Sequence, residues 1–377
     1  MFLFPFAFLL VWLAGLLSLS LLGGGVYLIY AWYVGIVIGI GYLIGGVVML
    51  LVSLLGRPLV LLLLGRHGAD EPHMVRGGET HRIAGADGTE LQVEVYGRSD
   101  APTLVLTHGW GLNSTEWYYA KQALAERFRL IVWDLRGLGE STRPNNNDYH
   151  LERMAHDLRA VVDFTGKGPV TLVGHSIGGM IMLTFCRLFP QELGRRVQGL
   201  VLTNTTYTTP THTILASSFF RAIQKPIIEP LTYLTIWLAP VMWLMNWLSY
   251  LNGSLQAIAA LAGFAGCETR GQIDFVARFQ LLAWPGVAAR GSLGMMRFDE
   301  TDTLPHISVP TLVVGGDHDR LTRPHASLHM GETIPNADLV MLQPSGHMGV
   351  LEQHDQFAQA VEKFVAETQR RASERAA

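Results

Sequence analysis

The sequence has 377 residues, of which 16% are charged, and its net charge is −3. This length allows one large domain with an additional segment, and the near-neutral charge gives no reason to expect a nucleic-acid partner. The two cysteines, Cys186 and Cys267, cannot form a disulfide framework. The mean hydropathy of +0.26 is high for a water-soluble enzyme, which directs attention to where the apolar residues lie.

The apolar excess lies at the N-terminus, where residues 1–56 contain no Asp, Glu, Lys, Arg or His. Residues 2–22 and 26–55 are each long enough to cross a bilayer, which requires about 20 residues, and glycines 23–25 separate them. Because the first run has no basic start and is followed directly by another apolar run, a cleaved signal peptide is disfavoured. The sequence predicts a transmembrane module of two helices over residues 1–56.

Aromatic and glycine residues near the join fit such a transmembrane hairpin. The aromatic residues, which are typical of the belt at a membrane interface, are Tyr27, Tyr30, Trp32 and Tyr33. Two G-x-x-x-G spacings, Gly35 to Gly39 and Gly41 to Gly45, predict close packing of the two helices.

Basic residues predict the orientation of the hairpin. They follow the second span at Arg57, Arg66, Arg76 and Arg82, whereas the short connection between the spans carries none. The positive-inside tendency favours both ends of the hairpin in the cytoplasm. We therefore expect a two-pass membrane anchor with a cytoplasmic catalytic domain. A single long span followed by a partly inserted segment is the alternative that the pattern leaves open.

An α/β domain is expected after a linker at residues 57–79. The expected strands are 80–84 and 90–96, which form a hairpin, followed by 104–107, 130–133, 170–173, 199–203, 311–314 and 339–342. The expected helices are 114–127, 150–164, 180–189 and 353–370. This alternation predicts a mostly parallel eight-stranded sheet flanked by helices, built from residues 80–204 and 304–370.

Residues 205–303 interrupt the alternation, because they show no strand signal and residues 230–267 carry no charge. A single membrane crossing there would place Ser176 and the later strands on opposite sides of the bilayer. We therefore interpret residues 205–303 as a helical cap inserted over the active site. Its tryptophans would either line an apolar approach or touch the membrane surface, and the sequence leaves both possibilities open.

A glycine-flanked serine follows the predicted strand 170–173. The residues Gly174-His175-Ser176-Ile177-Gly178 form a G-x-S-x-G motif between a strand and a helix, which is the context of a nucleophile elbow. A serine on such a turn exposes its Oγ, and only small neighbours allow the backbone to turn so tightly. Ser176 is therefore the candidate nucleophile.

A nucleophilic serine requires a base and a carboxylate that orients the base. His347 lies in a loop after the last predicted strand, and Asp317 and Asp319 lie after the preceding one. All of them fall at carboxyl ends of strands, where ligands bind in sheets of this kind. The order Ser, Asp, His is the one expected for a hydrolase with this motif.

The reaction also requires an oxyanion hole, meaning backbone N–H groups aimed at the developing negative charge. Ile177, which follows the serine at a helix N-terminus, is one candidate donor. Trp110, in the loop His108-Gly109-Trp110-Gly111 after the third strand, is the other. Trp110 and His175 are also candidate substrate-binding residues, although His175 fits equally well as a structural residue packed under the turn.

Together these residues resemble the α/β-hydrolase superfamily, in its Ser-nucleophile branch, over about residues 80–369. The motifs that carry the resemblance are His108-Gly109, Asp134-x-Arg136-Gly-x-Gly139-x-Ser141, Gly174-His-Ser176-Ile-Gly178-Gly, Gly316-x-x-Asp319 and Gly346-His347. In the family pattern the acid is the second Asp of a Gly-x-x-Asp, which implies Asp319 rather than Asp317. Members with an Asp nucleophile are disfavoured because Ser176 occupies that position, and Gly111 departs from their His-Gly-x-Pro pattern.

The resemblance implies an α/β-hydrolase fold preceded by the transmembrane hairpin, with the layout of membrane-anchored hydrolases of monoacylglycerols or related lipid esters. We therefore expect a serine ester hydrolase that acts on lipid-like substrates at the bilayer and needs no cofactor or metal. A perhydrolase or haloperoxidase-like enzyme, a thioesterase or a C–C bond hydrolase would use the same triad. A non-catalytic, membrane-tethered binding protein is the alternative from another class.

Overall fold

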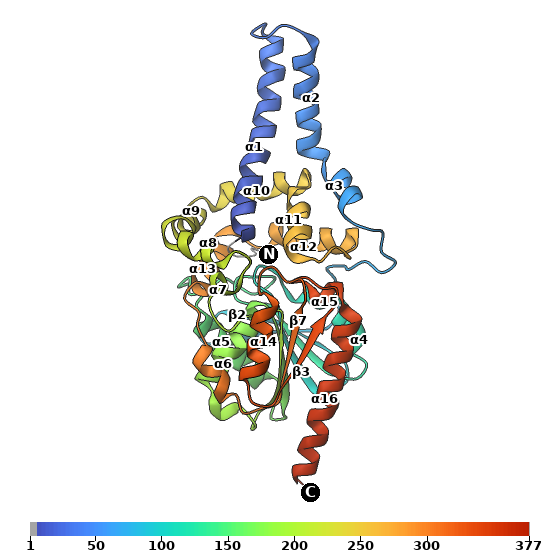
Figure 1. The fold of residues 1–377 in the computed structure, drawn as a ribbon, viewed down its shortest axis with the longest axis vertical. Coiled ribbons are helices and arrows are strands. Elements are labelled where there is room, and N and C mark those ends of the chain that lie inside the picture. Colours follow the sequence, from blue (N-terminus) through green and yellow to red (C-terminus); the bar gives the residue numbers. More distant parts are fainter. Residues whose placement is uncertain (1–5, 377) are drawn as a thin grey trace.

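The computed structural model describes residues 6–376, and its centre is one eight-stranded sheet in the order β1-β2-β4-β3-β5-β6-β7-β8 (Figure 1). The strands are β1 (Glu79–Ala84), β2 (Glu90–Tyr96), β3 (Thr103–Thr107), β4 (Arg129–Trp133), β5 (Val170–His175), β6 (Val197–Thr203), β7 (Thr311–Gly316) and β8 (Ala337–Leu342). Strands β1 and β2 pair antiparallel with each other, β2 pairs antiparallel with β4, and all other pairings are parallel. The predicted α/β-hydrolase fold is confirmed.

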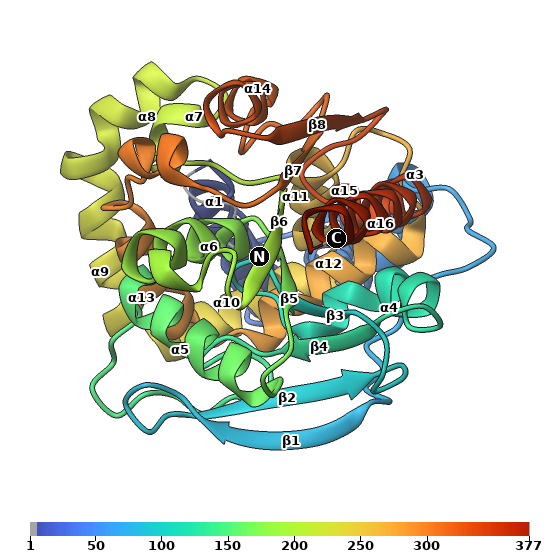
Figure 2. The ribbon, with the colours of Figure 1, turned by 90° about the horizontal axis from the view of Figure 1, so that it is seen from below.

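Helices cover both faces of the sheet (Figure 2). Helices α5 (Leu151–Phe164) and α6 (Ile177–Leu188) lie on one face, and α4 (Tyr118–Leu124) and α16 (His354–Ala376) lie on the other. Helix α14 (Pro324–Thr333) packs against β7 and β8. The short helices η1 (Ser114–Trp117), η2 (Pro190–Glu192) and α15 (Gly349–Glu352) complete this part. Because helices pack on both faces of the sheet, side chains on either side of a central strand are buried. This explains the continuous Val, Leu and Ile runs of the central strands.

The parallel register brings several loops to one edge of the sheet. Thr107 at the end of β3 is aligned with Gly174 in β5, and Thr203 of β6 is aligned with both His175 and Val314. The residues that follow these strands therefore meet at the same carboxyl edge, which is where ligands bind in such sheets.

A helical insertion follows β6 and lies over this edge (Figure 1). It consists of α7 (Pro210–Thr213), α8 (Ser217–Ile223), η3 (Gln224–Ile228), α9 (Glu229–Trp237), α10 (Ala239–Leu251), α11 (Ser254–Gly263), α12 (Arg270–Leu282), α13 (Pro285–Met295) and η4 (Thr301–His306). It contributes no strand to the sheet, as the sequence predicts. We refer to the segment from α7 to η4 as the helical insertion.

The N-terminal helices form a hairpin that projects from the helical insertion (Figure 1). They are α1 (Phe6–Tyr33) and α2 (Ile40–Leu55), and α3 (Arg57–Leu64) continues α2 after a bend of 67°. By length and composition α1 alone could cross a membrane; α2 with α3, and residues 217–237 with α10, would qualify only if each bent pair counted as one span.

Two expectations for this hairpin differ from the structure. The glycines at 23–25 lie inside α1, and the chain turns at residues 34–39 instead. A Cβ added to Gly35 or Gly39 in the turn would meet no atom within 4 Å. Gly25 and Gly46 form the close helix contact instead, because a Cβ on Gly46 would lie 2.9 Å from the Gly25 carbonyl oxygen. The glycines within α1 therefore allow close helix packing, although the sequence pattern suggests a break there.

The predicted linker also differs at its start. Residues 57–64, expected to begin the linker, are helical because they pack against α11 and α12.

Candidate active site

The turn after β5 holds Ser176 in an unusual backbone conformation, with φ 54° and ψ −119°. Small neighbours make the turn possible. A Cβ on Gly178 would lie 2.2 Å from the carbonyl oxygen of Thr107, and a Cβ on Gly174 would lie 2.6 Å from the backbone of Gly178. Such strain persists only where the surroundings over-determine it, and it is concentrated at functional sites. The side chain of Ser176 remains partly exposed at the N-terminus of α6.

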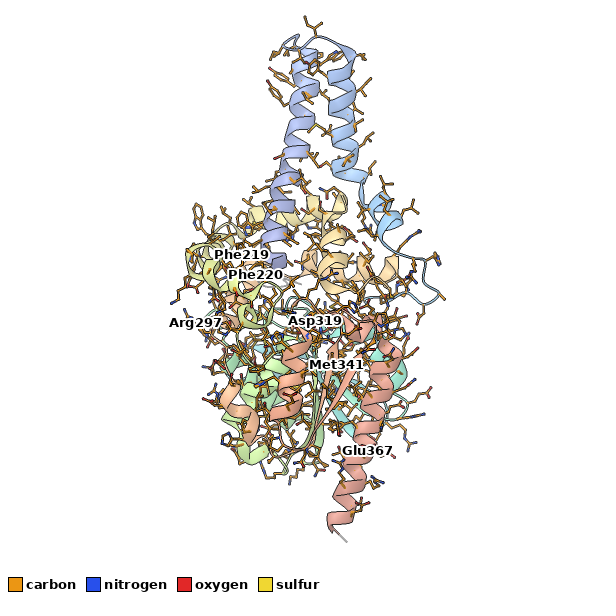
Figure 3. The ribbon with its side chains drawn as sticks, viewed as in Figure 1. Phe219, Phe220, Arg297, Asp319, Met341 and Glu367 are labelled. Carbon is orange, nitrogen blue, oxygen red and sulfur yellow. The ribbon has the colours of Figure 1, made fainter. Side chains whose placement is uncertain are left out.

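The three residues predicted as a triad lie in mutual hydrogen-bonding contact. Nε2 of His347 is 3.0 Å from Oγ of Ser176, and Nδ1 of His347 is 2.9 Å from Oδ2 of Asp319. The serine follows β5, the aspartate follows β7 and the histidine follows β8, so the carboxyl edge of the sheet assembles all three. Figure 3 shows Asp319 between the sheet and the helical insertion.

Asp319, rather than Asp317, contacts the histidine. Its Oδ1 accepts hydrogen bonds from the amides of Leu321 and Thr322, at 2.8 and 3.0 Å, and the Thr322 hydroxyl donates to its Oδ2 at 2.8 Å. Burial by itself would raise the pKa of Asp319, but the nearby His347 and the donated hydrogen bonds outweigh burial and hold that pKa below its ordinary value. Asp317 instead contacts the neighbouring His318 and accepts the amide of Ser345.

Three supporting residues were not predicted from the sequence. The side-chain amide of Asn204 donates to Oδ2 of Asp319 and to the carbonyl of Gly346, both at 3.1 Å. The Thr205 hydroxyl donates to the carbonyl of Ser176 at 2.6 Å, and Thr322 completes the set through its bonds to the aspartate. Their position in the sequence could have indicated two of them, because Asn204 and Thr205 directly follow β6, at the sheet edge where the predicted triad lies.

The two residues expected to supply the oxyanion-hole amides follow β5 and β3, whose ends are aligned at the carboxyl edge of the sheet. Ile177 is the first residue of α6, and Trp110 follows β3. Within residues 6–376 neither amide donates a hydrogen bond to another protein group. The indole of Trp110 is buried and donates from Nε1 to the carbonyl of Ala288 in α13 at 2.9 Å. Its ring therefore packs against α13 of the helical insertion.

His175, a candidate substrate contact, has a fully buried side chain. Its Nδ1 contacts the carboxylate of Glu116, and its Nε2 lies 3.0 Å from the carbonyl oxygen of His347. Burial alone would lower the pKa of His175, but Glu116 outweighs it and raises that pKa. The structure therefore places His175 underneath the turn, where it supports the site and is not open to a substrate.

The remaining motif residues hold loops in place. Asp134 accepts the amides of Ser114 and Glu140, at 2.7 and 2.8 Å, and Arg136 forms two hydrogen bonds with Asp157. Within residues 6–376 no group of three His, Cys, Asp or Glu side chains is arranged to hold a metal ion.

A model of the family described as alpha/beta hydrolase fold matches residues 102–224 and 249–353. The chain belongs to this family. The matched segments include Ser176, Asp319 and His347, and the interval between the segments lies in the helical insertion of this α/β hydrolase.

Two of the proteins similar in sequence have names that describe hydrolases. A protein of Stutzerimonas stutzeri, named "Putative carbamate hydrolase RutD", is 27% identical over 285 residues, which cover 74% of this chain and 97% of that protein. The pimeloyl-[acyl-carrier protein] methyl ester esterase of Aeromonas hydrophila is 27% identical over 289 residues, with 73% and 99% covered. The fold is also similar to an esterase of Exiguobacterium antarcticum, with a TM-score of 0.62, 23% identity, and 76% and 100% covered. The two sequence relatives support a hydrolase, and the structural neighbour supports the α/β-hydrolase fold.

Proposed function

We propose that the chain is a membrane-anchored serine hydrolase that cleaves carboxylic esters of lipid-like compounds, such as monoacylglycerols. The observation that carries the proposal is the continuous set of contacts from Ser176 through His347 to Asp319, at 3.0 and 2.9 Å. These are the distances at which a base can take the proton of a nucleophile while a carboxylate orients it.

In the proposed reaction, Oγ of Ser176 attacks the ester carbonyl carbon while Nε2 of His347 accepts the hydroxyl proton. The electron pair of the carbonyl moves to its oxygen, which receives hydrogen bonds from the Ile177 and Trp110 amides. The intermediate collapses to an acyl-enzyme, and His347 gives its proton to the departing alcohol oxygen. Water then repeats these steps and releases the acid. Asp319 keeps the imidazole in the required tautomer and stabilises its positive charge.

The lipid-like substrate class is supported by the apolar parts of the chain. Helix α1 has a mean hydropathy of 2.1 over its most apolar window and is long enough to cross a membrane. We propose that α1 and α2 form a two-pass anchor with both ends in the cytoplasm, because Arg57, Arg66 and later basic residues follow α2 while the turn at 34–39 carries no charge. We further propose that residues 205–303 act as a cap over the catalytic edge.

Activity-based labelling tests this function. The full chain in native membranes is treated with a fluorophosphonate probe, which reacts with activated serines, and is assayed against p-nitrophenyl esters and monoacylglycerols. We expect labelling and hydrolysis, both abolished in Ser176→Ala. Hydrolysis and labelling that persist in Ser176→Ala would place the nucleophile elsewhere, and a complete lack of labelling in the parent chain would favour a binding protein. Assays with added peroxide, with thioesters and with substrates for C–C bond cleavage test for a perhydrolase, a thioesterase and a C–C bond hydrolase, respectively.

A further inference from the structure

The first part of α1 is embedded in the helical insertion. Ala7, Phe8 and Val11 are buried there, at 0%, 1% and 1% exposure. A Cβ on Gly15 would lie 2.9 Å from Cβ of Met245 in α10, so the two helices lie in close contact. Helix α10 also contacts α2 and runs across the base of the hairpin (Figure 1). The hairpin therefore starts inside the insertion.

Hydrogen bonds fix this arrangement. Nε1 of Trp12 donates to the hydroxyl of Thr235 in α9 at 2.9 Å. The hydroxyl of Ser18 lies 2.9 Å from that of Ser249 and accepts a bond of 2.7 Å from the Asn252 side chain. Ser18 is the last residue along α1 with such a bond to the insertion. The hairpin and the insertion are joined as one packed unit and not by a free linker.

The projecting part of the hairpin is shorter than a bilayer core. Beyond Ser18, residues 19–33 of α1 rise about 22 Å at 1.5 Å per residue. In α2, residues 40–52 precede the buried Ser53 and rise about 20 Å. The hydrocarbon core is about 30 Å thick. The missing distance is close to the thickness of one helix layer, about 10 Å.

The helix layer at the base of the hairpin exposes the apolar surface needed to extend the membrane-embedded part by this distance. It consists of α10 with the neighbouring α3 and the end of α9. Its large exposed aliphatic and tryptophan side chains are Leu59, Leu62, Leu63, Leu64, Leu234, Trp237, Val241, Trp243, Leu244 and Trp247. Soluble proteins rarely expose so many neighbouring apolar side chains. Residues 230–267, which include all of α10, carry no charge.

The first charged residue after the hairpin, Arg57, is compensated by Asp274 of the adjoining helix α12. Nε and Nη2 of Arg57 bond to the two carboxylate oxygens of Asp274 at 2.8 and 2.5 Å. The hydroxyl of Tyr250 donates to the same carboxylate at 3.2 Å, and its ring lies 4.7 Å from the guanidinium carbon. An ion pair satisfied in this way is the form in which a charge is tolerated near lipid.

Resting on the membrane anchoring in the proposed function, we propose that α10, with α3 and the end of α9, lies within the near leaflet of the bilayer. The occupant of this apolar face is the acyl-chain region of the lipid, because the face is continuous with the apolar hairpin and supplies the length that the hairpin lacks. The cover of the active site is then itself part of the membrane anchor, and Ser176 faces the leaflet that holds its substrates.

Spin labels at defined depths test this arrangement. One cysteine at a time is introduced at Trp243 or Leu59 in the layer, at Val26 in the hairpin, or at the exposed Lys363 on α16. The parent is a Cys267→Ser chain, in which the remaining Cys186 is buried. The full-length variants are reconstituted in phosphatidylcholine–phosphatidylglycerol vesicles. Collision rates with oxygen, which concentrates in lipid, and with a water-soluble nickel chelate are compared. Fluorophosphonate labelling of each variant confirms that its active site is folded.

We expect the labels at Trp243 and Leu59 to show an oxygen-to-nickel ratio several-fold above that at Lys363, at a depth shallower than Val26. Nickel access at Trp243 and Leu59 equal to that at Lys363, with Val26 still shielded, would overturn the immersion of the layer while leaving the anchor intact. Nickel access at Val26 would overturn the anchoring as well. Spin–spin broadening that disappears on dilution with unlabelled chain would identify a second copy as the cover instead, and would also overturn the proposal.

Discussion

The carboxylate of Glu116 contacts Nδ1 of His175 beneath the nucleophile turn, and both side chains are fully buried. The other carboxylate oxygen accepts the amide of Gly109, which precedes Trp110, at 2.8 Å. Nε2 of His175 lies 3.0 Å from the backbone oxygen of His347. One buried pair therefore joins the loop of the expected oxyanion hole to the backbone of the expected base.

Removal of this carboxylate should lower turnover without removing the triad. In Glu116→Ala the Gly109 amide loses its acceptor and the loop shifts, and a misplacement of about 1 Å at a catalytic group costs on the order of 100-fold. We expect kcat to fall by about this factor with KM nearly unchanged, because the oxyanion contact is made in the transition state. Glu116→Gln keeps an acceptor for Gly109 and should recover most of kcat. Equal kcat values in both variants and the parent chain would contradict a positioning role.

Asp319 and Asp317 form a matched pair for testing the acid. In Asp319→Asn the carboxamide no longer fixes the tautomer of His347 or stabilises its positive charge, so we expect kcat to fall on the order of 10⁴-fold. Asp317→Asn changes a carboxylate that contacts His318 and Ser345, outside the triad, and should stay within a few-fold of the parent chain. Steady-state ester hydrolysis measures both. A larger loss in Asp317→Asn than in Asp319→Asn would reverse the assignment.

The sheet and the proximity of Ser176, His347 and Asp319 could be predicted from the sequence because both depend on local patterns. Short apolar runs mark the strands, and parallel strands bring their carboxyl ends together whatever the loops contain. Glu116 and Asn204 were missed for the opposite reason. Their partners, His175 and Asp319, are distant in sequence. The local sequence does not distinguish a buried glutamate from a glutamate on a solvated helix, nor an asparagine that supports the site from one in an ordinary turn.

The hairpin shows a similar limit. The apolar N-terminal segment is plain from composition, but the position of its turn depends on tertiary contact. Gly25 lies opposite Gly46 across the helix pair, so the glycines that suggest a break permit close packing and α1 continues to Tyr33. The joining of α1 to the insertion through Trp12 and Ser18 has no signature at all in the sequence of either partner.

The nucleophile turn makes a further prediction about stability. In Gly178→Ala the added methyl group would lie 2.2 Å from the backbone oxygen of Thr107, which cannot move without displacing β3. Overpacking of this kind costs about 1–3 kcal/mol or more, so we expect a lower unfolding temperature and reduced fluorophosphonate labelling. Gly168→Ala, where the added methyl group meets no atom within 4 Å, is the control. Similar unfolding temperatures in the two variants would show that the turn tolerates the larger residue.

The burial of Lys121 should make the free energy of unfolding depend on pH. Its ammonium group in α4 lies 3.2 Å from the carbonyl oxygen of Val75 and 5.0 Å from the centre of the Tyr96 ring. Burial, only partly offset by the carboxylate of Glu94, lowers the pKa of Lys121 from 10.5 to about 8. Between these two values the folded chain has released a proton that the unfolded chain still holds. Folding is therefore favoured more strongly as the pH rises through this window.

The contribution of Lys121 is fully present above pH 10.5 and is lost as the pH falls through about 8. It amounts to about 3 kcal/mol over the whole window, at 1.36 kcal/mol per pKa unit. Lys121→Met removes this dependence, so thermal unfolding in detergent should show the stability of the variant relative to the parent chain falling between pH 7.5 and 10. The exposed Lys167→Met controls for loss of a surface charge. A difference between Lys121→Met and the parent chain that is constant with pH would mean that Lys121 titrates alike in the folded and unfolded chain.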